Sequence, residues 1–225
     1  MMKITPYLLL LILLITACKD TEKRDFSKRP DTLKLDYAAN RDMFIILSIL
    51  PDSLVTHYNW ARNERGNMYD SERELGYAID STGNLQNIVK FQNDYIELKK
   101  NDISFSLRAY QIGDGEYIIL SKEKTPDTTL FKGFQVYKNT SLQVPLEEAI
   151  GRYKNNFYKD ATNQACLDDL NLKESDFEFD ITEPNKLFIE IKTPEKKAKK
   201  DCLNGTYQTM FFSDKVGPFN LESVK

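Results

Sequence analysis

Alternating apolar and polar residues recur through most of the chain beyond residue 76 and predict β-strands. In residues 103–109 every second residue is apolar, as in a strand with one buried face. Gly-Asp-Gly at 113–115 then predicts a hairpin turn into a strand at 117–120. Strands joined by short turns form an antiparallel meander. The same pattern predicts strands at 77–80, 95–98, 131–137, 177–181, 187–191, 207–212 and 219–222.

A helical period appears in shorter stretches between these strands. Residues 41–50 carry apolar side chains at helical spacing, with Asn40 as the expected N-cap and Pro51 as the stop. Ser71-x-x-Glu74 predicts a capping box at the start of a second helix. Pro145 suits the first turn of another helix, extending to 153. The expected fold class is α+β, mainly an antiparallel β-sheet meander with an N-terminal helix and one or two further short helices.

The first 18 residues follow the pattern of a signal peptide. Lys3 precedes an apolar run of 11 residues at 7–17, whereas a spanning helix needs about 20. The run ends in Ile15-Thr16-Ala17-Cys18, which resembles the lipobox of bacterial lipoproteins. In that family a peptidase cuts before the cysteine, and the cysteine receives acyl chains. The resemblance implies a lipid anchor on Cys18; the alternative is an ordinary signal peptide that contains a cysteine.

This reading divides the chain into a signal peptide at 1–17, an acylated cysteine and flexible tether at 18–36, and a globular domain at 37–225. A further boundary near 139–160, dividing the globular domain into two parts, is compatible with the composition. The tether carries many charged and few apolar residues, too few to offset chain entropy by burial. As a whole the chain resembles small envelope lipoproteins of Bacteroidetes-type bacteria. The resemblance implies attachment to a membrane, the outer membrane above all, with exposure to the periplasm or cell surface.

The cysteine count fits an oxidising compartment. With Cys18 assigned to lipid, Cys166 and Cys202 remain as an even pair, for which we expect a disulfide. A loop of this length is stabilised by roughly 3–4 kcal/mol in the chain-entropy model. Two buried free thiols are the alternative. A zinc site is disfavoured because the chain has a single histidine.

Composition narrows the classes of partner. Lys and Arg number 31 against 34 Asp and Glu, and this balance gives no general attraction to nucleic acid. There is no Walker loop, dinucleotide fingerprint, zinc spacing or haem motif, so we expect no cofactor and no metal.

The single histidine and the single tryptophan fall together in His57-Tyr58-Asn59-Trp60. Without a Gly-x-Ser-x-Gly elbow, this segment does not indicate triad catalysis. We take His57, Tyr58, Trp60 and Tyr69 as candidate ligand contacts on an aromatic surface, with ordinary core packing as the favoured alternative.

Two charged stretches lie toward the C-terminus. Asp176, Glu178 and Asp180 alternate and share one face of an expected strand. Alternate carboxylates lie about 6.6 Å apart, which is unfavourable for one calcium ion, so a solvated face is favoured. The lysine-rich run at 192–200 is assigned to a solvated turn that neutralises these acids. An anionic headgroup or an acidic partner is its alternative role.

Four Asp-Ser or Asp-Thr pairs resemble the short O-glycosylation acceptor pattern of Bacteroidetes-type bacteria. The resemblance makes Thr32, Ser53, Ser81 and Thr128 candidate acceptors. The same pairs also begin turns and caps for backbone reasons.

These features predict a lipid-anchored envelope protein, and a non-catalytic binding module for a protein, peptide or glycan is the favoured function. An inhibitor or immunity-type lipoprotein acting against a secreted hydrolase or toxin is the alternative. A carboxylate-based hydrolase is less favoured and requires a deep cleft with two acids about 5–10 Å apart. An envelope assembly factor is compatible with the same features.

Replacing Cys18 by alanine is expected to abolish acylation, because the acyl chains lose their attachment atom. Detergent phase partition and intact mass of the wild type, Cys18→Ala and a Thr21→Ala control test this. An unacylated wild type would contradict the anchor.

Overall fold

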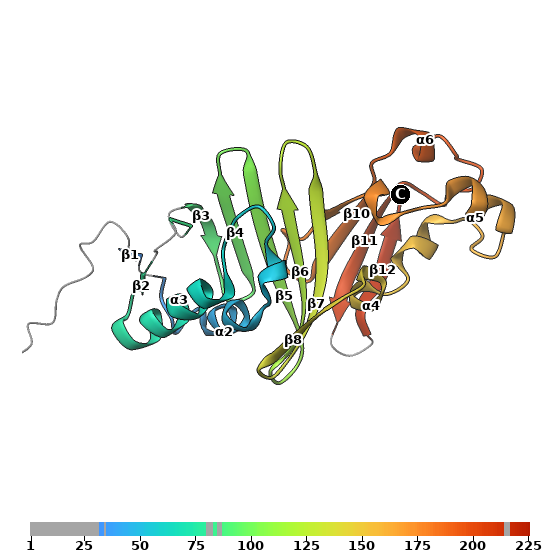
Figure 1. Cartoon of the computed structure of the whole chain (residues 1–225). Helices are drawn as coiled ribbons and strands as arrows, with labels where there is room; N and C mark the ends of the chain where they lie inside the picture. The colour runs from blue at the N-terminus through green and yellow to red at the C-terminus, as the bar shows by residue number, and fades with distance from the viewer. Residues whose placement is uncertain (1–31, 34, 80–82, 85–86, 214–216) are drawn as a thin grey trace, which may run out of the picture.

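The computed structural model describes residues 32–33, 35–79, 83–84, 87–213 and 217–225. The predicted signal peptide, Cys18 and Ser81 lie outside these residues. Within them the chain forms a central six-stranded sheet, a helical layer and a four-stranded sheet (Figure 1). None of the described helices is long and apolar enough to cross a membrane.

Both large sheets are antiparallel, which confirms the expected α+β fold. The six-stranded sheet follows chain order, and the four-stranded sheet has the order β12-β11-β10-β9. A short pair, β1 (Thr32–Leu33) and β2 (Ala78–Ile79), lies apart from them. The six strands are β3 (Ile88–Phe91), β4 (Tyr95–Lys100), β5 (Ile103–Gly113), β6 (Glu116–Lys124), β7 (Thr129–Tyr137) and β8 (Thr140–Val144). The four are β9 (Phe177–Asp180), β10 (Lys186–Ile191), β11 (Tyr207–Ser213) and β12 (Gly217–Val224).

The helices lie before, between and within the sheets in sequence. The α-helices are α2 (Arg41–Ile49), α3 (Arg62–Leu75), α4 (Leu146–Ile150), α5 (Gln164–Leu170) and α6 (Pro194–Lys197). Short 3₁₀ turns occupy η2 (Asp52–Leu54), η4 (Tyr153–Phe157) and η5 (Glu174–Asp176). The region between the two sheets, 145–176, covers most of the stretch in which the sequence allowed a further boundary.

Of the two predicted caps, one is confirmed in position and the other is wrong. Asn40 is the N-cap residue of α2, but its side chain makes no cap hydrogen bond and instead donates to the carbonyl oxygens of Leu35 and Asp36. Ser71 lies inside α3 rather than at a helix start, and its hydroxyl donates to the Met68 carbonyl.

Helix α3 begins nine residues earlier because two carboxylates bind its first backbone N–H groups. Glu64 Oε2 accepts from the Ala61 N–H at 3.0 Å, and Asp52 Oδ1 accepts from the Arg62 N–H at 2.5 Å. Carboxylates at this end also suit the helix dipole. Gly76 ends the helix in the left-handed conformation, with φ at 74°.

One face of the six-stranded sheet packs against α2 and α3. Alternate residues of the central strands, such as Phe105 and Leu107 in β5 and Ile119 in β6, meet Phe44 and Leu47 of α2 in one apolar cluster. All five are fully buried. This cluster is the N-terminal core.

The opposite face of the same sheet packs against the four-stranded sheet. Ile118 and Leu120 of β6 join Phe177, Phe179 and the inward residues of β10 in a second cluster, the C-terminal core. Helix α4 and η4 close one side of it. The middle of β6 is therefore buried on both faces, which explains its continuous apolar run at 117–120.

Two cations on this second face bind backbone carbonyls of β9 and of the two residues that follow it. Arg108 is fully buried, and its guanidinium donates to the carbonyls of Ile181 at 2.5 Å and Thr182 at 2.8 Å. It also pairs with Asp94 at 2.6 Å. Lys122 Nζ donates to the Phe179 carbonyl of β9 at 2.8 Å. Carbonyls at the end of the hairpin strand thus obtain donors from the larger sheet.

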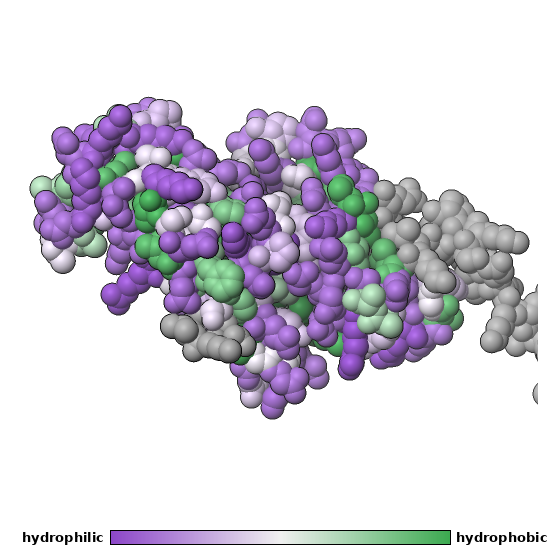
Figure 2. Space-filling view, turned by 180° about the vertical axis from the view of Figure 1, so that it is seen from behind, coloured by the Kyte–Doolittle hydropathy of each residue, from purple (hydrophilic) through white to green (hydrophobic). Residues whose placement is uncertain are grey.

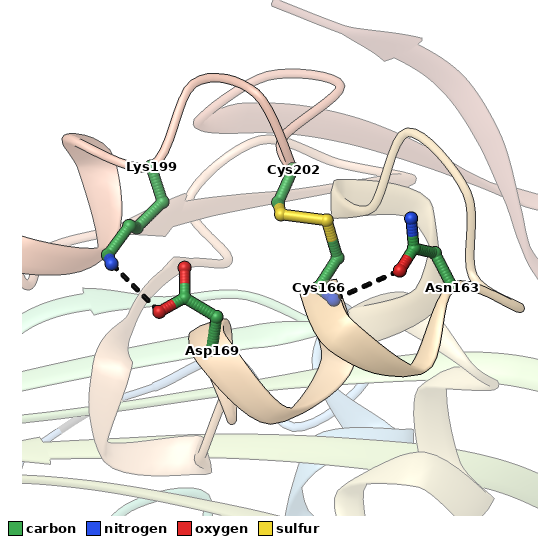
Figure 3. Close-up of a disulfide and its surroundings, with 5 residues drawn as sticks. All are labelled: Asn163, Cys166, Asp169, Lys199 and Cys202. Atoms are coloured by element: carbon green, nitrogen blue, oxygen red, sulfur yellow. Dashed lines mark hydrogen bonds and ion pairs between the residues drawn. A yellow bond between two sulfur atoms is a disulfide. The ribbon is translucent and has the colours of Figure 1, made fainter.

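The predicted disulfide between Cys166 and Cys202 is confirmed (Figure 3). It joins α5 to the segment between α6 and β11, with the two Cα atoms 5.3 Å apart. Asn163 Oδ1 accepts from the Cys166 N–H and caps α5, and Lys199 pairs with Asp169 at 2.8 Å beside the bond. The disulfide therefore links two segments that each place a leucine, Leu170 and Leu203, in the C-terminal core.

Replacing Arg108 by methionine is expected to destabilise the fold by about 3 kcal/mol, because two buried carbonyls lose their donor while side-chain volume is kept. Urea unfolding measures the effect. Arg73→Met on the exposed surface of α3 is the matched control, with an expected change below about 0.5 kcal/mol. Equal midpoints for the two variants would show that Arg108 does not hold the sheets together.

Candidate functional site

The hairpin of β9 and β10 presents acids and an aromatic ring on the face turned away from the C-terminal core. In the register of this hairpin Glu178 lies opposite Glu190, and Asp180 lies opposite Phe188. Residues between them, such as Ile189, point inward and are buried. The period of two thus separates a core face from a polar and aromatic face.

Strand β11 adds a second ring to this face. Tyr207 lies opposite Glu190, and its ring is stacked with Phe188 at a centroid distance of 6.1 Å and an interplanar angle of 23°. Together they border an open hollow of about 350 Å³ that we call the acid–aromatic hollow. Its lining residues are Lys122, Glu178, Asp180, Thr182, Phe188, Glu190 and Tyr207.

Two lysines fix the carboxylates of the hollow. Lys122 Nζ binds Glu178 Oε1 at 2.5 Å, and Lys197 Nζ binds Glu190 Oε1 at 2.6 Å. Directly opposed glutamates repel each other, so the lysines offset an unfavourable pair. Asp180 Oδ1 accepts from the Thr182 N–H at 2.8 Å. Each carboxylate keeps a second oxygen that can accept a hydrogen bond from a ligand.

The acids around the hollow affect the pKa of the Tyr207 hydroxyl. Burial raises the pKa of Tyr207 first, and Asp180, Glu183 and Glu190 raise it further, against a lowering hydrogen bond with Thr209. A site of this kind can accept donors and cations, and it has no nucleophile hydrogen-bonded to a base.

The predicted aromatic surface around His57 is divided by the fold. Tyr58 and Trp60 are only 4% and 2% exposed and pack in the N-terminal core, so neither ring is presented to solvent. His57 is exposed, whereas Tyr69 is half-buried on α3 and packs beside Tyr37, with ring centroids 6.0 Å apart. The structure therefore does not bring the four residues together on one surface.

Two buried charged side chains bind the backbone of this segment and of the residues just before it. Glu123, 2% exposed, accepts from the N–H groups of Thr56, His57 and Tyr58 at 2.7–3.0 Å. Arg65 is fully buried and donates to four backbone carbonyls, those of Leu47, Leu50, Pro51 and Trp60. These bonds draw the segment inward, which gives it a structural role.

The charged stretches of the sequence meet in space. Besides the Lys197–Glu190 and Lys199–Asp169 pairs, Lys196 donates to the Leu170 carbonyl. Lys197 and Lys199 thus neutralise Glu190 and Asp169, whereas Glu178 of the predicted acid set pairs with Lys122 from outside the run. Asp176 does not pair with a lysine of the run. Its carboxylate accepts from the Thr193 hydroxyl and the Lys173 N–H at 2.8 Å each. Among the described residues no group of three or more His, Cys, Asp or Glu is placed to hold a metal.

The candidate O-glycosylation acceptors have different settings. Thr128 lies exposed in the turn between β6 and β7. Ser53 lies in η2, and its hydroxyl donates to Gln143 Oε1 at 2.9 Å. Thr32 pairs through its backbone with Ile79, and Ser81 lies outside the described residues. Modification of these sites stays a prediction.

Lys122, Phe188, Glu190 and Tyr207 were not predicted as site residues. The alternation of Phe188 and Glu190 with buried isoleucines was a usable signal, because it turns both toward the face of Glu178 and Asp180. The contribution of Lys122 depends on contact between the sheets and has no sequence signal. Figure 2 shows the molecule from behind, with small hydrophobic areas among mostly hydrophilic ones. A mixed aromatic and charged site therefore fits the general character of this surface.

The chain matches no protein-family model, curated protein or solved structure with which it was compared. The functional argument therefore proceeds from the geometry of the site.

Stability is expected to fall as the pH rises from about 10 to 12. Burial raises the pKa values of Tyr58, Tyr95 and Tyr117 to about 12 in the fold, whereas an unfolded tyrosine titrates near about 10. Above that pH the unfolded chain releases protons that the folded chain keeps, which favours unfolding. Urea midpoints at several pH values measure this. Tyr58→Phe should weaken the dependence and exposed Tyr137→Phe should not; a pH-independent midpoint would contradict the assignment.

Proposed function

We propose that this chain is a non-catalytic binding module, tethered to an envelope membrane through acylated Cys18, with the acid–aromatic hollow as its ligand site. The observation that carries the proposal is the hollow itself, in which two stacked rings lie among three carboxylates. The ligand classes considered are a protein, a peptide or a glycan.

The fixed positions of the polar groups support a binding role. Glu178 and Glu190 are each held by a lysine, and Asp180 is held by the Thr182 backbone. Acceptors that are already oriented lose little conformational freedom when a ligand arrives, which favours affinity. Aromatic rings supply contact area at low entropic cost. The volume, about 350 Å³, lies at the lower end of ligand pockets and suits one residue or one sugar of a larger partner.

The tether supports the same proposal. Because β1 begins at Thr32, the segment before it, residues 18–31, has 14 residues and reaches at most roughly 50 Å when extended. A module held by such a segment can sample partners away from the membrane surface. Inhibition of a secreted hydrolase or toxin is the form that this binding takes if the partner is such a protein.

Disrupting the hollow is expected to reduce capture of the natural partner. The experiment is a pull-down from detergent-solubilised envelope with lipidated bait, comparing the wild type with Phe188→Ala/Tyr207→Ala. Loss of two central aromatic contacts is expected to lower capture at least about tenfold. Tyr137→Ala, a tyrosine that is 53% exposed on the other sheet, is the matched control.

Two results would contradict the proposal. Equal capture by the double variant would place the binding site elsewhere on the molecule. Conversion of a captured partner or glycan by the wild type, with loss of that activity in Glu178→Gln, would replace the binding role by an enzymatic one. Circular dichroism of each variant establishes that it is folded.

A further inference from the structure

The acid–aromatic hollow carries more negative than positive charge on its walls. Its lining contains three carboxylates, Glu178, Asp180 and Glu190, and one lysine, Lys122. The ammonium of Lys122 is already bound to Glu178 and to the Phe179 carbonyl. Lys197 binds Glu190 from outside the lining. Among the described residues Asp180 accepts from the neutral backbone N–H of Thr182 and forms no ion pair, so its charge is available to a ligand.

The two rings favour the same kind of ligand. A cation near the face of an aromatic ring is attracted by the ring quadrupole, and the attraction grows as water is removed. Tyr207 and Phe188 lie directly beside Glu190 and Asp180 in the register. An ammonium or guanidinium group in the hollow therefore meets a ring and a carboxylate together. A neutral hydroxyl group would donate hydrogen bonds to the same acceptors, but it would not be attracted by their negative charge.

The spacing of the acids indicates how such cations are arranged. Glu178 and Asp180 are alternate residues of β9, so their positions along the strand differ by about 6.6 Å. Alternate side chains of an extended peptide have the same spacing. Cations at positions i and i+2 of such a peptide can therefore meet successive acids of this strand.

We propose that the acid–aromatic hollow binds an extended basic peptide segment of a partner protein, with lysine or arginine at alternate positions. This inference rests on the proposed function, since it names the ligand class of the same site. The recognition is charge-assisted, and increasing salt weakens it.

The test is isothermal titration of the mature chain with capped peptides of defined charge and spacing. The probes are Gly-Lys-Gly-Lys-Gly, its glutamine and glutamate counterparts, and the isomer Gly-Lys-Lys-Gly-Gly. The alternating lysine peptide is expected to bind most tightly and to weaken as salt is raised. Binding of the glutamine peptide with equal affinity would overturn the proposal.

Asp180→Asn isolates the charge of the hollow. Asparagine keeps an oxygen that can accept from the Thr182 N–H, so the local turn is preserved while the negative charge is removed. The expected loss is about tenfold in affinity for the lysine peptide. Asp127→Asn in the exposed β6–β7 turn is the matched control and should leave the affinity unchanged. Equal affinities for Asp180→Asn and the wild type would also overturn the proposal.

A neutral oligosaccharide, the trimer of N-acetylglucosamine, separates this inference from the proposed function. If the sugar binds, the lysine peptide does not, and Phe188→Ala/Tyr207→Ala abolishes sugar binding, then the hollow is a ligand site and the basic-peptide inference is wrong. If neither probe binds and envelope capture is unchanged in that double variant, then the proposed function fails as well.

Discussion

Arg108 lies where the two sheets meet, and the C-terminal sheet depends on the hydrogen bonds that it donates. Strand β9 ends the four-stranded sheet, and the two residues that follow it, Ile181 and Thr182, direct their carbonyls at Arg108 of the larger sheet. A carbonyl withdrawn from water is costly unless a donor reaches it. Arg108 supplies two donors at 2.5 and 2.8 Å and also lies over the Tyr95 ring, at 4.5 Å from its centroid. These bonds join the end of β9 to the six-stranded sheet.

The candidate site is a consequence of the same junction. Lys122 donates to the β9 edge and, with the same ammonium, holds Glu178 in the hollow. One side chain therefore links sheet packing to the orientation of a ligand-facing carboxylate. Removing Lys122 would alter both, which is why Asp180 and the two rings are the more informative positions. Their contacts lie on the outward face and leave the buried junction intact.

The sequence predicted the features that depend on local periodicity. Residues 103–109 and 177–181 alternate strictly, and both form strands because one face or the other must be buried. The pairing of Cys166 with Cys202 followed from compartment and count alone. Helix α3 was mispredicted because Asp52, ten residues before Arg62, caps it through a contact that the periodic pattern does not report. Core packing, the alternative that the sequence favoured for Tyr58 and Trp60, is what the structure shows, but nothing in the sequence indicates that Glu123 binds the backbone around them. The hollow was missed for a related reason: its walls come from four strands, and only the register of β9, β10 and β11 places their side chains together.

The position of β1, where the described chain begins, relative to the hollow also bears on function. Strand β1, the first described element, lies at one end of the molecule, and β10, β11 and β12 lie toward the other (Figure 1). A tether that leads from an acylated Cys18 to β1 would attach the molecule by its helical end. The four-stranded sheet would then face away from the membrane, toward partners in the surrounding space. A negatively charged hollow in that position is also separated from the negative potential of an anionic membrane, which decays within roughly 10 Å at 0.1 M salt. If Cys18 is acylated as proposed, basic segments that would otherwise bind the lipid surface could be captured beyond it, because the acids would lie on the sheet farther from the anchor.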